Sequence, residues 1–190
     1  MLALDALHNR ISVNLLCEPA PSAEQLENIF KAGLRACDHK NLRPWRFLLI
    51  EGDARHRFGE LMVKAKEGQD VNIECLEEEK NKLRNKPFRA PTIVAVVADI
   101  KPHKKVPEIE QLLSAGAAAQ MMMTAAYAQN LGAIWRSGSL MFEDTMKEGL
   151  GLTQDQKLVG FLYLGQIKAS KNVPKLNPDD YVVRWGEAAP

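Results

Sequence analysis

The feature that most constrains this chain is a stretch without a single charged side chain, which runs from residue 111 to residue 135. Its length would be enough to cross a lipid bilayer as a helix. However, polar side chains such as Gln111, Gln120 and Thr124 interrupt it, and alanine, glycine and methionine make up much of the rest. Such a composition favours a helix that is buried on most of its sides inside a globular protein. We therefore expect a helix over residues 108–131 and no membrane partner.

The composition is that of one globular unit. Of the 190 residues, 46% are apolar and 26% are charged, which is far from the composition of disordered chains. We expect a single domain over residues 1–190. The 25 basic and 24 acidic side chains leave a net charge of +1, so no nucleic-acid partner is expected. Three cysteines without a Cys-x-x-Cys pair indicate neither a disulfide framework nor a zinc cluster, and they favour a reducing, cytoplasmic location.

Local patterns predict the remaining helices and strands. Ser22 followed by Gln25 is a capping-box pattern and marks the start of a helix. Helices are expected over residues 2–8, 22–36, 53–85 with a break near 69–72, and 143–150. Strands rich in β-branched and aromatic residues are expected over residues 45–51, 92–99 and 157–167. Because these elements do not alternate as in a Rossmann domain, the pattern favours an α+β fold.

The end of the chain, residues 168–190, is predicted to be a tail. Its one apolar run is YVVRW at residues 181–185, and no strand close in sequence could pair with it. Chain termini fray unless something holds them. We therefore expect the tail to dock on the body of the chain or on a second subunit.

Several common catalytic patterns are missing. The chain has no Gly-x-Ser-x-Gly nucleophile turn, no phosphate-binding loop of the Gly-x-x-x-x-Gly-Lys type and no Gly-x-Gly-x-x-Gly dinucleotide fingerprint. Its four histidines, His8, His39, His56 and His103, are scattered without the spacing of metal ligands. The sequence therefore predicts neither a nucleophilic triad nor a metal site.

Three polar clusters remain as candidates for a binding site. Arg10 and Ser12 offer a guanidinium and a hydroxyl group, which suit a phosphate monoester. A second cluster, residues 35–41, lies between a predicted helix and a predicted strand, where loops commonly present functional side chains. A third cluster, residues 135–138, combines an aromatic ring, a cation and backbone donors, as a flat heteroaromatic ligand needs. Each cluster alone could equally be an ordinary helix end or turn.

Together with further blocks, these clusters make the sequence recognisable. The blocks are NRIS at 9–12, RACDHKNLRPW at 35–45, RAP at 89–91, KVP at 105–107, SAGAA at 114–118, GAIWRSG at 132–138 and VGFLYLG at 159–165. In order and spacing they resemble the FMN-dependent nitroreductase family over essentially the whole chain. The resemblance implies a nitroreductase-like α+β fold, with a central mixed sheet flanked by helices, and an intertwined homodimer. It also implies one FMN per subunit at the dimer interface and a tail that docks on the partner subunit.

The resemblance assigns the phosphate end of the cofactor to the first cluster. Arg10, Ile11 and Ser12 match the segment that holds the phosphate and ribityl chain of FMN. Arg35 and His39 match positions that the neighbouring subunit presents toward the same flavin. Either of these two side chains could be the cation that flavin chemistry favours near N1 and the C2 carbonyl.

The resemblance places the ring system of the cofactor at the third cluster. Trp135, Arg136 and Ser137 match the stretch beside the isoalloxazine ring, whose backbone donates to flavin N5. A stretch that such proteins sometimes use for the nicotinamide nucleotide corresponds to Ala125, Ala126, Tyr127, Ala128, Gln129 and Asn130. This second stretch has no charge with which to receive a phosphate.

The sequence departs from the family pattern at the phosphate segment. The usual Arg-Arg-Ser-x-Arg motif is replaced by residues 10–14 with the sequence RISVN, so that two cations are missing at Ile11 and Asn14. Cys37 also stands where a proline is common. Each lost cation would weaken phosphate binding by about 1 to 3 kcal/mol unless Arg35 or Arg136 compensates.

The expected activity follows from the resemblance. Such an enzyme passes hydride from NADH or NADPH to flavin N5 and then to a nitroaromatic, a quinone or a similar flat acceptor, by ping-pong exchange. No catalytic side chain is expected, because the flavin carries the chemistry. The alternatives are a flavin-binding protein with little turnover, favoured by the missing cations, and a structural protein without a cofactor.

Overall fold

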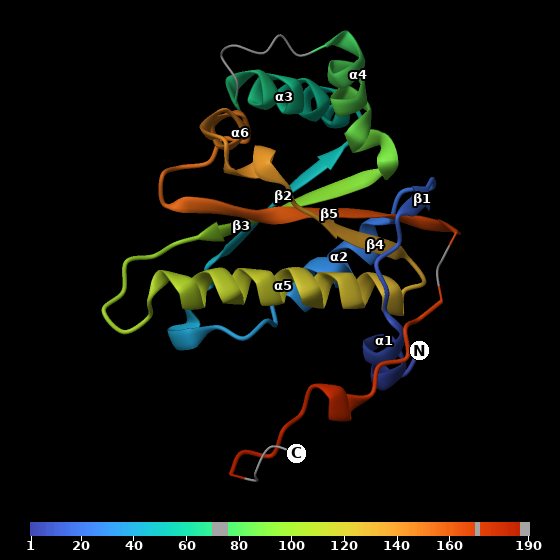
Figure 1. The fold of residues 1–190 in the computed structure, drawn as a ribbon, viewed down its shortest axis with the longest axis vertical. Helices are drawn as coiled ribbons and strands as arrows, with labels where there is room; N and C mark the ends of the chain where they lie inside the picture. The colour runs from blue at the N-terminus through green and yellow to red at the C-terminus, as the bar shows by residue number, and fades with distance from the viewer. Residues whose placement is uncertain (70–75, 170–171, 187–190) are drawn as a thin grey trace.

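A five-stranded sheet forms the centre of the computed structural model, which describes residues 1–69, 76–169 and 172–186 (Figure 1). The strands are β1 (Leu15–Cys17), β2 (Trp45–Glu51), β3 (Thr92–Asp99), β4 (Gly132–Arg136) and β5 (Gln156–Ala169). The long strand β5 pairs with β1, β3 and β4, and β2 pairs with β3. Strand β5 therefore links three of the four other described strands into one sheet.

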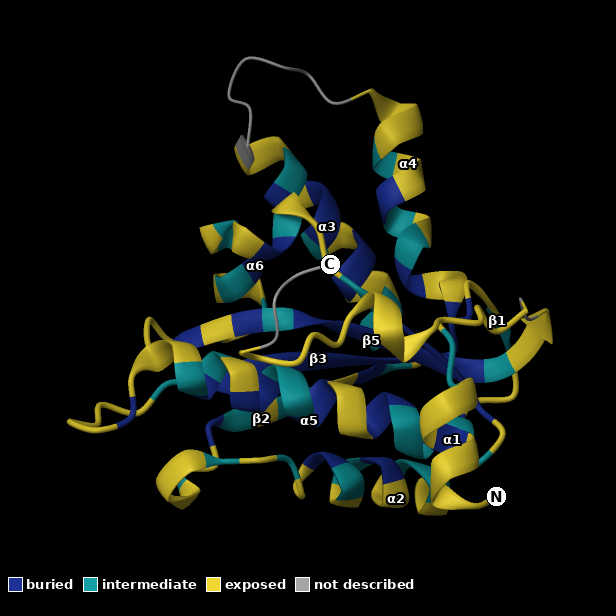
Figure 2. Cartoon of the chain, turned by 60° about the horizontal axis from the view of Figure 1, so that its bottom comes forward, coloured by how far each residue is buried: buried dark blue, intermediate teal, exposed yellow. Residues whose placement is uncertain are grey.

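Helices cover both faces of the sheet (Figures 1 and 2). They are α1 (Ala3–Asn9), α2 (Ala23–Gly33), α3 (Ala54–Gln69), α4 (Glu77–Asn85), α5 (Glu108–Ala128) and α6 (Asp144–Gly149). Short 3-10 turns are η1 (His39–Asn41), η2 (Lys86–Arg89), η3 (Ser139–Phe142) and η4 (Pro178–Asp180). Helices α5, α2 and α1 lie on one side of the sheet, and α3, α4 and α6 lie on the other. This confirms the expected α+β class with a central sheet flanked by helices.

Strand β3 is the most buried part of the chain. Each residue from Ile93 to Ala98 is fully inaccessible to solvent, which agrees with its unbroken apolar sequence. Its side chains alternate between two hydrophobic clusters, one under α3 and α6 and the other against α5 and α2. The two faces of the sheet therefore have separate hydrophobic cores. On a neighbouring strand, successive side chains likewise point alternately toward one core and the other.

Helix α5 is buried along one face only within the described chain, and not on most sides as its composition predicts. Its buried residues recur every three or four positions and are Gln111, Ser114, Ala115, Ala118, Ala119, Met122, Met123 and Ala126. On the other side, Ile109, Leu113 and Met121 are exposed to 58, 65 and 39%. The helix thus has a second uncharged surface that its own chain leaves uncovered.

The uncharged stretch also ends differently from the prediction. The helix stops at Ala128, Asn130 adopts a left-handed backbone with φ of 62°, and residues 132–136 form β4 instead of closing the helix. Asparagine is one of the few residues that adopt this conformation readily, so it permits the sharp exit from the helix. The five-residue strand escaped prediction because no change in charge separates it from the helix.

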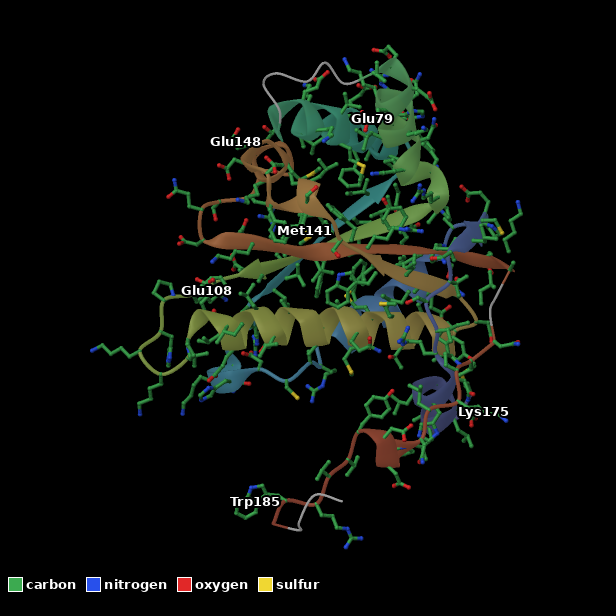
Figure 3. All side chains as sticks on the ribbon, viewed as in Figure 1. Glu79, Glu108, Met141, Glu148, Lys175 and Trp185 are labelled. Atoms are coloured by element: carbon green, nitrogen blue, oxygen red, sulfur yellow. The ribbon has the colours of Figure 1, made fainter. Side chains whose placement is uncertain are left out.

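A further difference concerns strand direction. All four pairings among the described strands are antiparallel, so within the chain the sheet is not mixed. The helical stretch predicted over 53–85 forms two helices, α3 and α4, in agreement with a break between them; of the predicted break at 69–72, residues 70–72 lie outside the described residues. The run at 181–185 forms no strand and is exposed, and Trp185 projects from the body (Figure 3).

Two absences apply only to the part of the chain that the structure describes. In residues 1–69, 76–169 and 172–186, no helix is both long and apolar enough to cross a membrane. Cys17 and Cys37 are free thiols, while Cys75 falls outside the described residues.

Candidate functional site

Strand β4 sends neighbouring side chains to opposite faces of the sheet. Trp135 packs toward α5, where its indole lies against Gly116 and directly over Gly160 of β5. A β-carbon at Gly160 would collide with the indole, so glycine is required there. Arg136, the next residue, points to the other face and lies over the ring of Tyr163, with 5.4 Å from its Cζ to the ring centroid. The end of β4 thus presents a fixed cation to the side covered by α3.

A pocket of about 440 Å³ opens beside Arg136. Its walls include the backbone turn after β4, residues 136–139, which supplies the hydroxyls of Ser137 and Ser139. Its apolar lining consists of Met62, Ile134, Leu140, Met141, Met146 and Phe161. Met141 lies where η3 meets the sheet (Figure 3). The volume and the apolar lining with a few polar groups are typical of a site for a flat organic ligand.

The pocket has a strongly positive character. Lys86 and Arg89 of η2 join Arg136 in its lining, which contains no acidic side chain. None of these three cations has a hydrogen bond or an ion pair with another described residue. Burial and the nearby Arg89 both lower the pKa of Arg136 and that of Lys86, and Arg136 also lowers the pKa of Lys86. The pocket therefore holds positive charge that a bound anion would neutralise.

Two further observations show that Arg136 lacks an acceptor within the described part of the chain. The Nε atom of Arg136 is buried and has no hydrogen-bond partner among the described residues, an arrangement that costs free energy. Burial raises the pKa of Tyr163 to about 12, although Arg136 and Arg89 oppose this effect. The phenol therefore stays neutral and does not serve as a counter-ion for the guanidinium. An oxygen-rich ligand would satisfy the orphaned donor.

The turn η2 is held in place by Arg55 of α3. Its Nη1 donates to the carbonyl oxygen of Ala90 at 3.1 Å, and its guanidinium lies 5.1 Å from the centroid of the Phe88 ring. Pro87, within the turn, is buried. Pro87 and Phe88 are thereby held in place between Lys86 and Arg89. Both cations line the pocket.

The first predicted cluster lies alongside the outer edge of β4. Arg10 is the C-cap of α1, and its backbone N–H donates to the carbonyl oxygen of Ala6 at 3.1 Å. Three residues later, the N–H of Val13 donates to the carbonyl oxygen of Ala133 at 2.9 Å, which attaches this segment to the strand. Within it Ile11 is half-buried and Ser12 exposed. The Nη1 atom of Arg10 is buried without a partner among the described residues, so this guanidinium is also available to an anion.

The second cluster forms a tight polar turn elsewhere in the chain. Both carboxylate oxygens of Asp38 accept backbone N–H groups, from Leu42 at 3.1 Å and from Arg43 at 2.6 Å. His39 Nδ1 lies 2.7 Å from an oxygen of Glu110 at the start of α5. Arg35 lines a separate cleft. Within a single described chain, neither Arg35 nor His39 lines the pocket beside Arg136.

The stretch assigned weakly to a nicotinamide nucleotide is the C-terminal end of α5. Ala126 is fully buried against α2, and Ala125 and Tyr127 are half-buried. The side chain of Gln129 donates to the carbonyl oxygens of Gln25 and Ala125. Ala128 and Asn130 are exposed but bring no cation. The assignment of residues 125–130 stays a prediction.

Sequence reasoning identified one side of the pocket and missed the other. It named Trp135, Arg136 and Ser137, which the structure places together at the pocket beside Arg136. It missed Lys86 and Arg89, although the block RAP at 89–91 is part of the resemblance. The available signal was the spacing of two cations around Pro87 and Phe88 with no acid nearby. In the described part of the chain, no group of three or more His, Cys, Asp or Glu side chains could hold a metal ion.

Comparisons with known proteins agree with this architecture. The profile of the Nitroreductase family matches residues 11–166. The protein "Putative NAD(P)H nitroreductase YdjA" of Escherichia coli strain K12 is 45% identical over 184 residues, which cover 96% of this chain and 98% of that protein. The chain therefore belongs to the nitroreductase family.

Solved structures share the fold at lower sequence identity. A nitroreductase-like family protein from Bacillus cereus superposes with a TM-score of 0.82 at 22% identity, covering 98% of this chain and 97% of that one. A "putative nitroreductase in complex with FMN" from Desulfovibrio desulfuricans gives a TM-score of 0.73 at 24% identity, with 100% and 99% of the two chains covered. These likenesses establish a nitroreductase-like fold.

Proposed function

We propose that this protein is an NAD(P)H-dependent oxidoreductase that holds one FMN per subunit between two copies of the chain. The proposal is carried by Arg10 Nη1 and Arg136 Nε, two of the three buried guanidinium nitrogens that have no partner among the described residues; the third, Arg55 Nε, belongs to the arginine that holds η2. They suit the anionic and carbonyl oxygens of FMN, with which the Desulfovibrio desulfuricans protein of the same fold forms a complex. The name of the E. coli relative supports NAD(P)H as the electron donor.

The residues divide the work of binding. Arg10 and Ser12 would hold the phosphate and ribityl chain, with the backbone of Ile11 between them. The stretch Trp135 to Ser137 would lie along the isoalloxazine ring, and its backbone N–H groups would orient the ring. When bound, FMN would accept hydride from NADH or NADPH and pass it to a nitroaromatic, a quinone or a similar flat acceptor, in ping-pong exchange.

The cations of the pocket would set the electrostatics around the ring. Lys86, Arg89 and Arg136 line the pocket without any acid, so they favour negative charge on whatever the pocket holds. This assigns to them the role that the sequence left to Arg35 or His39. The apolar lining excludes water and accommodates a flat ring system. No side chain of this chain needs to act as a general acid or base.

A second copy of the chain would complete the site. Exposed apolar side chains occur on three segments: Leu2 before α1 with Leu4 and Leu7 within it, Ile109, Leu113 and Met121 of α5, and Tyr181, Val182, Val183 and Trp185 of the tail. Apolar surface of this extent is typical of an interface between subunits. In such a homodimer the tail would dock on the partner, and Arg35 and His39 would face the partner's flavin. We place the dimer in the cytoplasm.

Replacing Arg10 tests this assignment directly. Arg10→Ala leaves the phosphate without its buried donor, so we expect a loss of FMN affinity of about ten- to a hundredfold. The measurement is the flavin absorbance that stays with the protein through gel filtration and dialysis. Arg57→Ala, which removes an exposed arginine of α3, is the matched control. Retention of flavin at the wild-type level by Arg10→Ala would refute the phosphate assignment.

Anaerobic mixing separates the oxidoreductase from a flavin-binding protein with little turnover. NADH or NADPH should bleach the yellow colour of the bound flavin, and a flat acceptor should restore it. Colour that persists with both donors would favour the binding protein, and a preparation that stays colourless with added FMN would refute both.

A further inference from the structure

A second positively charged cleft lies at the polar turn that follows α2. It measures about 670 Å³ and is lined by the cations Lys31, Arg35 and Arg43, by Trp45 at the start of β2, and by one acid, Asp38. The dimensions fall in the range of small-molecule sites. A cation-rich wall next to an aromatic side chain suits a ligand that combines a phosphate with a flat base.

The single acid does not neutralise these cations. Asp38 is committed to the backbone, because its two oxygens accept the N–H groups of Leu42 and Arg43. The guanidinium groups of Arg35 and Arg43 make no hydrogen bond or ion pair with any described residue. Lys31 forms only an exposed pair with Glu27, at 2.7 Å. Within one described chain Arg43 is therefore available to an anion from solution, whereas Arg35 already has an assigned role toward the partner's flavin.

The backbone of the turn is preorganised in an uncommon conformation. Lys40, Asn41 and Arg43 all have positive φ, of 64°, 53° and 50°. Lysine and arginine adopt this region rarely, and such residues persist where the surroundings hold them, often at binding sites. Besides Asp38, Lys101 holds the turn, since its Nζ donates to the carbonyl oxygen of Leu42 at 2.6 Å. The turn thus places Arg43 at the cleft, and the positive φ values strain its backbone.

We propose that this cleft binds the phosphates and adenosine of the nicotinamide donor. The inference rests on the proposed function, in which His39 and Arg35 face the flavin of the second copy. A donor whose nicotinamide ring stacks on that flavin would extend its remaining, anionic part past Arg35 and into the cleft. The alternative stretch, residues 125–130, is uncharged, whereas the cleft offers three cations. The cleft therefore supplies the phosphate contacts that the sequence did not reveal.

The charge of the cleft also selects between the two donors. NADPH differs from NADH by a 2'-phosphate, which adds negative charge to the part of the donor assigned to the cleft. Because the guanidinium of Arg43 makes no hydrogen bond or ion pair with any described residue and has no role toward the flavin, the enzyme prefers NADPH, and the preference falls as salt screens the charges. The structure thus assigns a donor preference to residues outside the flavin pocket.

Calorimetric titration of the full-length protein with adenosine 2',5'-bisphosphate tests the cleft without any flavin chemistry. Wild type should bind it more tightly than adenosine, and Arg43→Gln should weaken binding about three- to tenfold. Arg43→Lys keeps the charge and should restore most of the affinity. Lys64→Gln removes an exposed cation of α3 and should have no effect. Arg43→Gly, which suits the positive φ, repeats the test should the glutamine variant fail to fold.

Steady-state kinetics then connect the cleft with the donor. Arg43→Gln should raise the KM for NADPH about three- to tenfold with kcat unchanged, because the contact is equal in ground and transition states. It should not affect 1-benzyl-1,4-dihydronicotinamide, which has no phosphate or adenosine. Equal behaviour of Arg43→Gln and Lys64→Gln in both assays would overturn the inference. A protein that binds no FMN would overturn the proposed function instead, and the calorimetric result would still decide on the cleft.

Discussion

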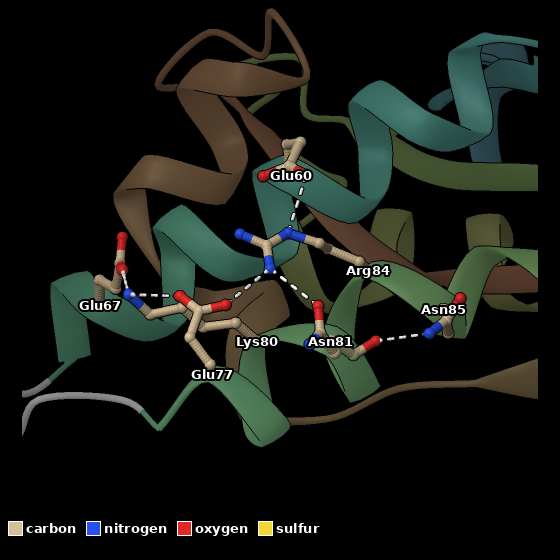
Figure 4. Close-up of polar contacts among 7 residues, drawn as sticks. All are labelled: Glu60, Glu67, Glu77, Lys80, Asn81, Arg84 and Asn85. Carbon is tan, nitrogen blue, oxygen red and sulfur yellow. Dashed lines mark hydrogen bonds and ion pairs between the residues drawn. The ribbon is translucent and has the colours of Figure 1, made fainter.

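Two groups of cations, one on the α3–α4 pair and one at the pocket beside Arg136, have opposite surroundings. In the α3–α4 pair, Arg84 donates to Glu60 at 2.9 Å, to Glu77 at 3.3 Å and to Asn81 at 3.0 Å (Figure 4). Lys80 lies 2.8 Å from Glu67 in the same network. At the pocket, by contrast, Lys86, Arg89 and Arg136 have neither an acid nor a hydrogen-bond partner among the described residues.

The pKa shifts of the cations in the two groups have opposite directions. Burial lowers the pKa of Arg84, but its hydrogen bonds to Glu60 and Glu77 outweigh this effect and leave the pKa raised. Burial and like charges lower the pKa of Lys86 and of Arg136. A cation paired within the chain serves the fold, whereas a cation kept near other cations costs stability unless something binds it. The comparison therefore distinguishes Arg84, which is paired within the chain, from Arg136, to which we assign a ligand-binding role.

Replacing one arginine in each group by glutamine should give the largest effect. Arg136→Gln should lower FMN affinity about ten- to a hundredfold, because a buried charged donor is lost. It should leave the melting temperature of the unliganded protein unchanged or higher, since the variant relieves repulsion by Arg89. Arg84→Gln should do the reverse, lowering the melting temperature with FMN affinity unchanged. Flavin fluorescence titration measures the FMN affinity of both variants, and thermal unfolding measures their melting temperatures.

The contrast would fail if both variants behaved alike. Equal loss of stability in Arg136→Gln and Arg84→Gln would mean that Arg136 is a structural residue with an unidentified partner. Equal loss of FMN affinity would mean that the charge of the whole helical layer matters, rather than contacts within the pocket.

Glycines in the two regions provide the second test. Gly160→Ala places a β-carbon against the indole of Trp135 and should displace β4, which carries Arg136. Overpacking of this kind costs about 1–3 kcal/mol of unfolding free energy. Gly68→Ala, near the end of α3, meets only the hydroxyl of Thr145 at 3.3 Å and gains helix propensity. Urea unfolding should therefore show a loss for Gly160→Ala and little change for Gly68→Ala; similar curves would mean that the wall of the pocket yields easily.

The sheet illustrates what the sequence could predict. Strands β2 and β3 begin and end at the predicted residues 45–51 and 92–99, because both are apolar runs bounded by polar turns. The capping box at Ser22 is also confirmed, since Ser22 and Gln25 exchange two hydrogen bonds. Strand direction could not be predicted, because the long connections between strands permit either sense. Strand β4 could not either, since its boundary with α5 depends on the left-handed backbone of Asn130 and on no change in composition.

The sequence predicts some of the residues at the candidate site, but it does not predict the positive charge of the pocket. Residues 135–137 could be placed from the resemblance, and the structure sets them at the pocket. Lys86 and Arg89 follow the charged sequence of α4, EEEKNKLRN, and look like its continuation. No acid occurs between residues 86 and 98, but Glu79 precedes Lys86 by the same seven residues that separate Glu77 from Arg84, so the spacing of charges does not distinguish Lys86 from Arg84. Only the fold brings Arg136 to them and turns two surface cations into a pocket of three.

The alkaline pH dependence of FMN binding gives the smallest and most selective test. Because burial, Arg89 and Arg136 lower the pKa of Lys86 below its usual 10.5, its charge is lost first as pH rises. An anion binds the charged form better, so affinity should fall about three- to tenfold as pH approaches 10.5 from neutrality. Tyr163, with its pKa raised to about 12, stays neutral over this range.

Lys86→Arg serves as the matched control, because arginine stays protonated throughout and keeps the charge. Its affinity should stay level over the range in which that of the wild type declines, and the ionisation of FMN itself is common to both titrations. Lys82→Arg, on the exposed surface of α4 where Lys82 pairs with Glu78 at 2.7 Å, should leave the decline unchanged. Parallel declines in wild type and Lys86→Arg would show that Lys86 does not contact the bound anion. The pocket would then depend on Arg89 and Arg136 alone.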